Sequence, residues 1–284
     1  MPMIPMSSMQ PRQRSAIFLI IAAVLWSTGG VFIKWLPLSP LTIAGARSAI
    51  AALVLLVWIR KPRPTWSAMQ IGAIISYAAT VVLFVVATKM TTAANAILLQ
   101  YTAPIWVSLL SVAITGERLR TADWMAVMVV MCGMSVFFLE KVAFDSLIGN
   151  ALAVLSGVAF AGVALFIRAQ RGVAAAESIL FGNILAALVC LPFAESYVVT
   201  PGVIGALLGM GVLQLGVSYI LYTKALVNVT AIQAVLFTTL EPLLNPIWVV
   251  LMIGEVPSPL SIVGGVLVIG GVVASQLRPS DRKL

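Results

Sequence analysis

The chain has 284 residues, of which 61% are hydrophobic and 9% are charged, and its formal net charge is +8. Soluble domains carry about 25% charged residues, and in water so apolar a chain would expose large apolar patches. The composition therefore excludes an ordinary soluble domain and indicates an integral membrane protein. Because the basic residues lie between hydrophobic runs, we expect them to set the orientation in the bilayer and not to bind nucleic acid.

Ten apolar segments have about the 20 residues that a helix needs to cross the hydrocarbon core. The first of them continues without the small-residue break at which a signal peptide is cleaved, so we expect it to remain in the protein. The connections are too short to form a soluble domain, and the predicted fold class is all-α integral membrane. The predicted spans, in chain order, are 15–34, 41–59, 66–88, 92–114, 121–140, 147–168, 178–194, 200–222, 230–252 and 258–276.

Ten spans place both chain ends on the same side of the membrane. If that side is the cytoplasm, 13 of the 17 lysines and arginines lie there, 3 lie on the far side and Arg47 lies inside a span. Such an excess of cytoplasmic positive charge is what the positive-inside rule predicts. We therefore expect a multi-pass protein of the plasma (inner) membrane, with cytoplasmic tails at 1–14 and 277–284.

The sequence contains an internal repeat. Residues 93–98 align with 231–236 at an offset of 138, and the same offset matches later prolines and glycines. The two halves then cover 15–140 and 147–276, with five predicted spans each. Because five is odd, the second half must enter the membrane from the opposite side, which makes an inverted repeat. In secondary transporters such halves enclose a substrate site near the bilayer midplane, so we expect a central cavity there.

Four pieces of the sequence resemble the EamA-type members of the drug/metabolite transporter superfamily. They are 24–28, 46–47, Pro104 followed by 116–119, and 240–242 followed by 254–255. The resemblance covers nearly the whole chain and implies a transporter whose spans 1, 3, 4, 6, 8 and 9 line the cavity. The first piece and the chain length are also similar to the YddG amino-acid exporters, which implies export of amino acids, aromatic ones included.

Glu241 is the acidic residue placed deep in a predicted span, where a charge costs at least about 2.5–3.5 kcal/mol. Gln233, Phe237, Glu241 and Asn245 recur every four residues and share one face of the ninth span. This face indicates a site that binds an ammonium group or carries a proton. The alternative is a structural carboxylate held by an arginine or by a neighbouring helix.

Aromatic and half-polar side chains also recur at helical spacing in spans 3 and 8, where they face either the cavity or a neighbouring helix. Trp26 and Phe160 occupy equivalent repeat positions at an offset of 134 and form a candidate aromatic clamp, with ordinary packing as the alternative. The predicted substrate-binding residues are Trp26, Tyr77, Thr80, Phe84, Phe160, Gln214, Ser218, Tyr222, Gln233, Phe237, Glu241 and Asn245.

Three further positions inside spans are expected to be structural or mechanical. Arg47 could bind a substrate carboxylate, pair with Glu241 or reach the interface; because the family pattern carries arginine here across many substrates, a structural role is favoured. Pro104 and Pro242 remove backbone hydrogen bonds at equivalent repeat positions. We therefore expect kinks in spans 4 and 9 that serve as hinges.

The chain has no histidine, no paired carboxylates in one span and no phosphate-binding loop, so we expect neither an enzyme nor a metal site or other cofactor. Cys132 and Cys190 lie in apolar runs and are expected to be free thiols. The predicted function is export of amino acids by alternating access, with substrate and lipid as partners and a monomer as the working assembly. The alternatives are an exporter of other metabolites or cationic drugs with proton antiport, and a channel.

Overall fold

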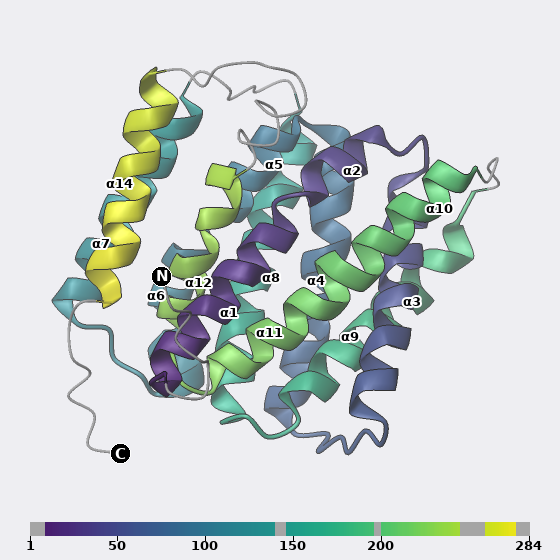
Figure 1. Cartoon of the computed structure of the whole chain (residues 1–284), viewed down its shortest axis with the longest axis horizontal. Coiled ribbons are helices and arrows are strands. Elements are labelled where there is room, and N and C mark those ends of the chain that lie inside the picture. The colour runs from purple at the N-terminus through teal and green to yellow at the C-terminus, as the bar shows by residue number, and fades with distance from the viewer. Residues whose placement is uncertain (1–8, 140–145, 196–199, 245–258, 277–284) are drawn as a thin grey trace.

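The computed structural model describes residues 9–139, 146–195, 200–244 and 259–276, and the regular structure in these ranges is helical (Figure 1). In chain order the elements are α1 (Pro11–Trp26), α2 (Gly29–Trp35), α3 (Pro40–Ile59), α4 (Ala68–Met90), α5 (Ala93–Gln100), α6 (Ala103–Thr115), α7 (Thr121–Phe138), α8 (Leu147–Ala169), α9 (Ala175–Cys190), the 3-10 helix η2 (Leu191–Phe193), α10 (Pro201–Leu208), the π-helix η3 (Gly209–Val217), α11 (Ser218–Leu226), α12 (Ala231–Thr238) and α14 (Pro259–Gln276).

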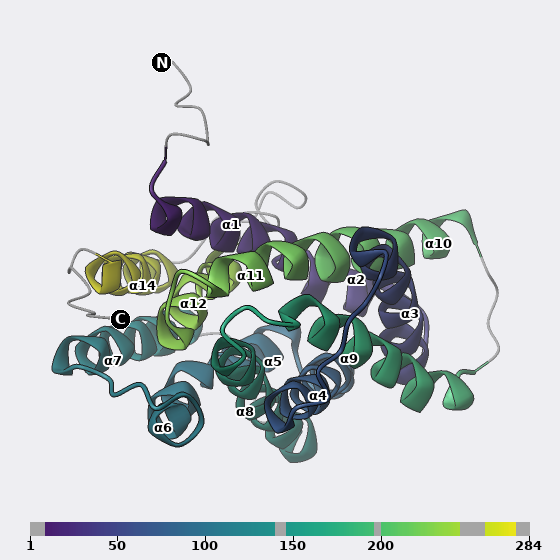
Figure 2. The same cartoon turned by 90° about the horizontal axis from the view of Figure 1, so that it is seen from below.

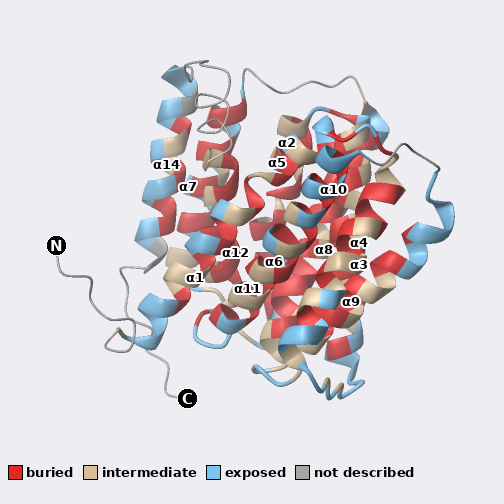
Figure 3. Ribbon diagram, turned by 45° about the vertical axis from the view of Figure 1, so that its right-hand side comes forward, coloured by how far each residue is buried: buried red, intermediate tan, exposed pale blue. Residues whose placement is uncertain are grey.

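Eight helical segments in the described ranges are long and apolar enough to cross a membrane, and two more, Ala231–Leu244 and Ile262–Ala274, are apolar but shorter. The predicted ninth span, 230–252, runs beyond the described residues. Many large apolar side chains are exposed, and exposed positions lie along the outer helices in Figure 3. Lipid is the solvent that such a surface requires. The multi-pass helical membrane protein predicted from composition is therefore confirmed.

Helices from the first part of the chain pack mainly on helices from the second part. α4 packs against α8, α7 against α14, α3 against α9, and α1 against α11. These neighbours lie side by side in both Figure 1 and Figure 2. The buried core is therefore built between two stretches of sequence that lie far apart in the chain, and any site in it draws on both.

Glycines allow α7 and α14 to come into backbone contact. A Cβ atom on Gly264 would lie 2.4 Å from the backbone nitrogen of Phe137, and one on Gly133 would lie 2.8 Å from that of Val268. In lipid, where apolar burial gives helices little reason to associate, such close packing supplies van der Waals contact over a long stretch. The close packing of α7 on α14 therefore depends on glycine at these positions.

The predicted fourth and ninth spans are each interrupted just before a proline. α5 ends at Gln100 and α6 begins at Ala103, with Pro104 in the first turn of α6. α12 ends at Thr238, and after a turn at Thr239 the chain is helical again over 240–244. Proline lacks the N–H that would continue the helical ladder, so an interruption at these points follows directly from the sequence. Both spans are thus interrupted where kinks were expected, whereas the kinks and their use as hinges remain predictions.

Two further spans depart from the α-helix near their middle. α1 ends at Trp26, and the hydroxyl groups of Ser27 and Thr28 donate to the carbonyls of Val24 and Leu25 at 2.7 and 2.9 Å before α2 begins. In the eighth span, η3 is a π-helix between α10 and α11. Departures of this kind are frequent at functional sites, because they expose polar backbone and side chains inside a membrane protein.

Substituting Gly264 with alanine tests the contact between α7 and α14. Because the new Cβ would meet the backbone of Phe137, we expect Gly264→Ala to lower the free energy of unfolding in detergent by about 1–3 kcal/mol. Gly270→Ala is the matched control, since nothing lies within 4 Å of a Cβ there. Thermal unfolding of both variants measures the difference, and equal midpoints would contradict the contact.

Candidate functional site

A cavity of about 50 Å³ lies between the helices. One water molecule needs roughly 10–15 Å³ of such space, so the cavity as it stands has room for a few waters. Its walls come from both halves of the sequence and combine aromatic rings with polar and charged groups. The lining residues are Trp26, Arg47, Thr80, Val81, Phe84, Gln100, Tyr101, Phe160, Gln214, Leu215, Tyr219 and Glu241.

The interrupted helices border this cavity. Trp26 is the last residue of α1, Gln100 is the last residue of α5, and Gln214 lies in the π-helix η3. Glu241 follows the turn that ends α12. A continuous helix uses its backbone groups internally, whereas an interrupted one can turn polar groups toward a cavity. The site is therefore built where four spans lose helical regularity.

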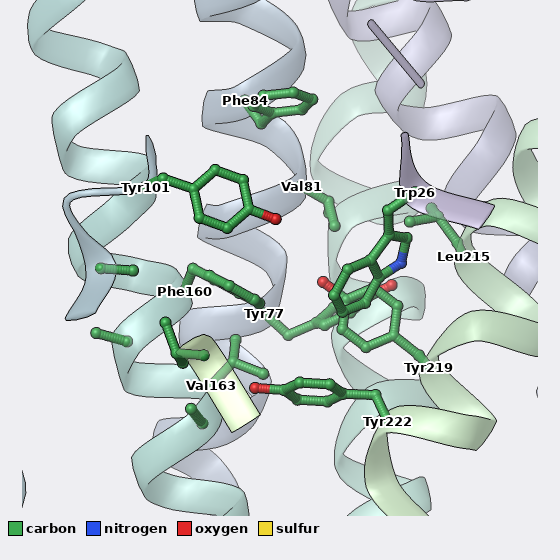
Figure 4. Close-up of a cluster of buried hydrophobic side chains, with 14 of the residues drawn as sticks. Trp26, Tyr77, Val81, Phe84, Tyr101, Phe160, Val163, Leu215, Tyr219 and Tyr222 are labelled. Carbon is green, nitrogen blue, oxygen red and sulfur yellow. The ribbon is translucent and has the colours of Figure 1, made fainter. Parts of the chain in front are cut away.

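Aromatic rings form one wall of the cavity (Figure 4). The Trp26 ring lies 4.8 Å from that of Tyr219 and 5.9 Å from that of Phe160, measured between centroids, and the pair with Phe160 is edge to face. Trp26 and Phe160, which the repeat places at equivalent positions, thus meet at the cavity. Tyr222 packs behind them, 5.4 Å from Trp26, and Tyr77 lies 4.7 Å from Tyr219. The wall offers flat apolar surface with several polar edges.

Arg47 carries a positive charge into this cavity without an acidic partner. Its side chain is 2% exposed, and it donates to the side-chain oxygen of Gln214 at 3.3 Å and to the carbonyl of Val81 at 3.1 Å. Its Nε–H has no hydrogen-bond partner. Buried charges are normally paired, because an unpaired one is costly to desolvate. Arg47 is thus held in place by neutral groups, with its charge left uncompensated.

Gln214 holds Arg47 in position. Its side-chain nitrogen donates to the carbonyl of Trp26 at 3.2 Å while its oxygen accepts from Arg47. The amide also fills the space beside Gly29, where a Cβ would lie 1.6 Å from the Gln214 nitrogen. The end of α1, the π-helix and α3 are therefore joined at one amide.

Glu241 supplies a carboxyl group on the same cavity. It is 8% exposed, and its Oε2 lies 2.5 Å from the hydroxyl oxygen of Tyr101. That hydroxyl also lies 2.7 Å from the backbone carbonyl oxygen of Thr238. No ion pair within 4.0 Å joins Glu241 to Arg47; the ion pair found in the described ranges is Arg168 with Glu117. The Arg47–Glu241 pair that the sequence left open is therefore not formed.

The remaining predicted site residues lie around the lining. Thr80 and Phe84 are in it, with Trp26, Phe160, Gln214 and Glu241. Tyr77 and Tyr222 are buried behind the aromatic wall; the Tyr77 hydroxyl bonds to Asn183 at 3.1 Å, and that of Tyr222 has no partner. Ser218 is buried and donates to the backbone carbonyl of Gln214.

Two described residues of the predicted polar face on the ninth span, Gln233 and Phe237, are not in the lining. Gln233 accepts from the backbone N–H of Thr230 at 3.1 Å and so caps α12. Phe237 is buried but is not among the lining residues. Asn245 falls outside the described residues. Of the three described residues of this face, the structure places Glu241 on the cavity.

The lining also includes residues that were not among the predicted substrate-binding residues: Arg47, for which a structural role was favoured, and Val81, Gln100, Tyr101, Leu215 and Tyr219. Gln100 and Tyr101 lie at the interruption before Pro104, which was itself visible in the sequence. Gln100 donates to Ser156 at 2.8 Å, and Ser156 donates to the carbonyl of Thr80 at 3.1 Å. Searching for polar residues within one turn of each span proline would have found both.

The described residues contain no group of three or more histidine, cysteine or acidic side chains that could hold a metal ion. Cys132 is exposed and Cys190 is buried, and both are free thiols. The chemistry of the cavity therefore comes from one cation, one carboxyl group, amides, hydroxyls and aromatic rings.

The chain is similar to known transporters over almost its whole length. The sequence profile of the EamA-like transporter family matches residues 13–139 and again 147–275. The uncharacterized transporter YwfM of Bacillus subtilis is 27% identical over 285 residues, which cover 94% of this chain and 95% of that protein. The pseudopaline exporter CntI of Pseudomonas aeruginosa is 28% identical over 186 residues, which cover 64% of this chain and 65% of that protein.

A solved structure shows the same fold. It is a crystal structure that superposes with a TM-score of 0.75 over 93% of this chain and 97% of its own, at 20% sequence identity. At that identity the likeness speaks for the arrangement of helices and not for what is carried.

Replacing Gln214 with leucine tests how Arg47 is held. The change removes the acceptor of a buried guanidinium group, so we expect Gln214→Leu to lower the free energy of unfolding by about 1–3 kcal/mol. Leu213→Ala, on the same segment but at an exposed position, is the control and should have a smaller effect. Chemical denaturation in detergent measures both. A neutral Gln214→Leu would mean that Arg47 does not depend on this amide.

Proposed function

We propose that this chain, which belongs to the EamA-like transporter family, is a secondary transporter that exports amino acids across the plasma membrane by alternating access. The observation that carries the proposal is a single cavity that holds a cation and a carboxyl group which do not pair with each other. A free amino acid carries the complementary pair, a carboxylate and an ammonium group. Such a substrate would satisfy both ends of the site at once.

Arg47 is the expected partner of the substrate carboxylate. A guanidinium group binds carboxylates through two parallel N–H donors, and it is more weakly hydrated than an ammonium group. Its Nε–H has no protein partner, so a donor is already free. Binding would also offset part of the cost of burying an unpaired charge. These features favour a binding role for a residue that the sequence alone assigned to structure.

Glu241 and the aromatic wall are expected to receive the other parts of the substrate. The carboxyl group of Glu241 would accept the ammonium group, and Trp26, Phe160 and Tyr219 would pack against a neutral side chain. Because the cavity has space for a few waters, it must widen when an aromatic amino acid enters. Mostly apolar walls discriminate weakly between neutral side chains, so we expect broad specificity.

The relatives support the class of function and not the choice of substrate. The name of one relative assigns it the export of pseudopaline, which supports export of a small metabolite by this chain. A cationic drug is a weaker candidate, because Arg47 would repel it from the same cavity. A channel is also weaker, because conduction needs an open pore and the cavity here is small.

Alternating access is proposed to arise from two five-helix halves of opposite orientation, with both termini in the cytoplasm. The family profile matches the chain twice, and the pairing of α1 with α11 mirrors that of α8 with α4. Equivalent residues also act alike. Lys34 donates to the carbonyl of Thr91 at 2.8 Å, and Arg168, its repeat partner, donates to that of Leu226 at 3.1 Å.

The interruptions near Pro104 and Pro242 are the proposed bending points of this movement. Helices bend most easily where the backbone ladder is already open, and rocking of one half against the other would close the cavity on one side and open it on the other. A monomer is proposed as the working unit.

Counterflow in liposomes tests the proposed function. Purified protein should give saturable exchange of labelled phenylalanine or leucine, with unlabelled substrate on the far side. The N-acetyl derivative lacks the ammonium group and the decarboxylated amine lacks the carboxylate, so each should compete about tenfold or more weakly. Flux that does not saturate would indicate a channel, and equal competition by the amine would contradict the role of Arg47.

Phe160→Leu tests the aromatic wall. Ring contacts of this kind contribute about 0.5–1.5 kcal/mol, so we expect the preference for phenylalanine over leucine to fall roughly 2- to 10-fold. Phe181→Leu is the matched control, because Phe181 packs on Trp66 and is not in the lining. Competition assays measure the preference for phenylalanine over leucine. The same change in both variants would mean that the aromatic wall does not determine this preference.

A further inference from the structure

At the edge of the cavity, the Tyr101 hydroxyl makes two short oxygen–oxygen contacts but has only one proton to donate to them. The hydroxyl oxygen of Tyr101 lies 2.5 Å from Oε2 of Glu241 and 2.7 Å from the carbonyl oxygen of Thr238. A tyrosine hydroxyl has one proton to donate, and a backbone carbonyl can only accept. If Glu241 were ionised, two acceptors would compete for that single proton, and one short contact would set lone pair against lone pair.

One additional proton resolves the geometry. We propose that Glu241 is protonated in this conformation, donates to Tyr101, which donates to Thr238, and releases its proton when substrate binds, so that the carrier exchanges substrate for protons. In this chain of bonds every short contact has one donor and one acceptor. The short O–O distance between Glu241 and Tyr101 is typical of a strong hydrogen bond.

Among the residues that the structure describes, no second donor to an ionised Glu241 is found on the cavity. On the cavity, the other charged or titratable groups are Arg47 from α3, Tyr101 at the end of α5, and Tyr219 from α11. Arg47 is engaged with Gln214 and Val81 and forms no ion pair with Glu241. α1, α4 and α8 present uncharged residues there: Trp26, Thr80, Val81, Phe84 and Phe160.

In the described ranges, three helices that pack on α12 away from the cavity, α6, α7 and α14, add no partner either. α6 and α14, which pack on α12, have no ionisable side chains. α7 also packs on α12 and has two, of which Asp123 accepts from the backbone of Arg120 and Cys132 is exposed. Within the described residues, a proton on Glu241 therefore satisfies both contacts of the Tyr101 hydroxyl.

Substrate binding changes this balance, a step that rests on the proposed function. An ammonium group placed beside Glu241 brings new N–H donors, so the carboxylate no longer needs its own proton. The O–H bond of Glu241 breaks, the proton passes to water on the side where substrate entered, and the ammonium group donates in its place. After substrate leaves on the other side, Glu241 takes a proton there. One neutral zwitterion moves out while one proton moves in.

Infrared difference spectroscopy of the purified full chain tests the protonation directly. Without substrate, we expect a carbonyl stretch of a protonated carboxylic acid at neutral pH, which disappears in Glu241→Gln and persists in Glu177→Gln. Glu177 is the control because it lies away from the cavity and accepts from the backbone of Arg63. In Tyr101→Phe the band should shift to that of an acid without this hydrogen-bond partner. A wild-type protein with no such band overturns the proposal, whatever the variants do.

Proton exchange is measured with phenylalanine as the probe. Adding it to protein in weakly buffered solution should release close to one proton per protein bound, and an inward proton gradient should drive its export from liposomes. Glu241→Gln should release none and lose the gradient response. If counterflow occurs but binding releases no proton, the coupling is wrong and the proposed function stands. If no amino acid shows counterflow, the proposed function fails, while the infrared band still decides the state of Glu241.

Discussion

The site depends on a buried cation, Arg47, and a buried carboxyl group, Glu241, that face one cavity without forming a pair. Had Arg47 and Glu241 paired, the cavity would have been neutral and closed to a charged ligand. They are kept apart because each is already engaged: Arg47 by an amide and a backbone carbonyl, Glu241 by the Tyr101 hydroxyl. Burying an unpaired charge is costly, and a protein retains it where a ligand or a proton completes the site.

Small residues make this arrangement possible by letting helices approach. Gly211 lies against α3, where a Cβ would meet the side chain of Ile50 at 2.5 Å and the carbonyl of Arg47 at 3.0 Å. Gly29 leaves room for the Gln214 amide, and Gly157 lies against the carbonyl of Gln100. With larger residues the π-helix could not reach Arg47, and α8 could not reach the end of α5. The polar groups of the cavity therefore depend on the glycines that let the helices come close.

The fold followed from sequence patterns that act over short distances or repeat. Hydrophobic runs predicted the helices, and the prolines predicted the interruptions. The offset of 134 brought Trp26 and Phe160 together, as the ring contact shows. Contacts that depend on side-chain direction did not follow. Gln214 meets Arg47 across 167 positions, and Tyr101 reaches Glu241 across 140. Gln233 shares a helical face with Glu241. Its side chain instead accepts from the backbone N–H of Thr230, which has no partner within the helix at the start of α12.

The family profile matches the chain twice, but equivalent positions at the two interruptions carry different chemistry. At an offset of 138 the counterpart of Glu241 is Ala103, and the counterpart of Tyr101 is Thr239. Both interruptions therefore exist, but one carries the carboxyl group and the other carries the hydroxyl that meets it. The bond between Tyr101 and Glu241 joins the two interruptions directly. In the proposed rocking movement, bending either span would lengthen or break this bond, so the proposed proton site lies where the two interruptions meet. The proposal thus couples binding at Glu241 to rearrangement of the halves through one short hydrogen bond.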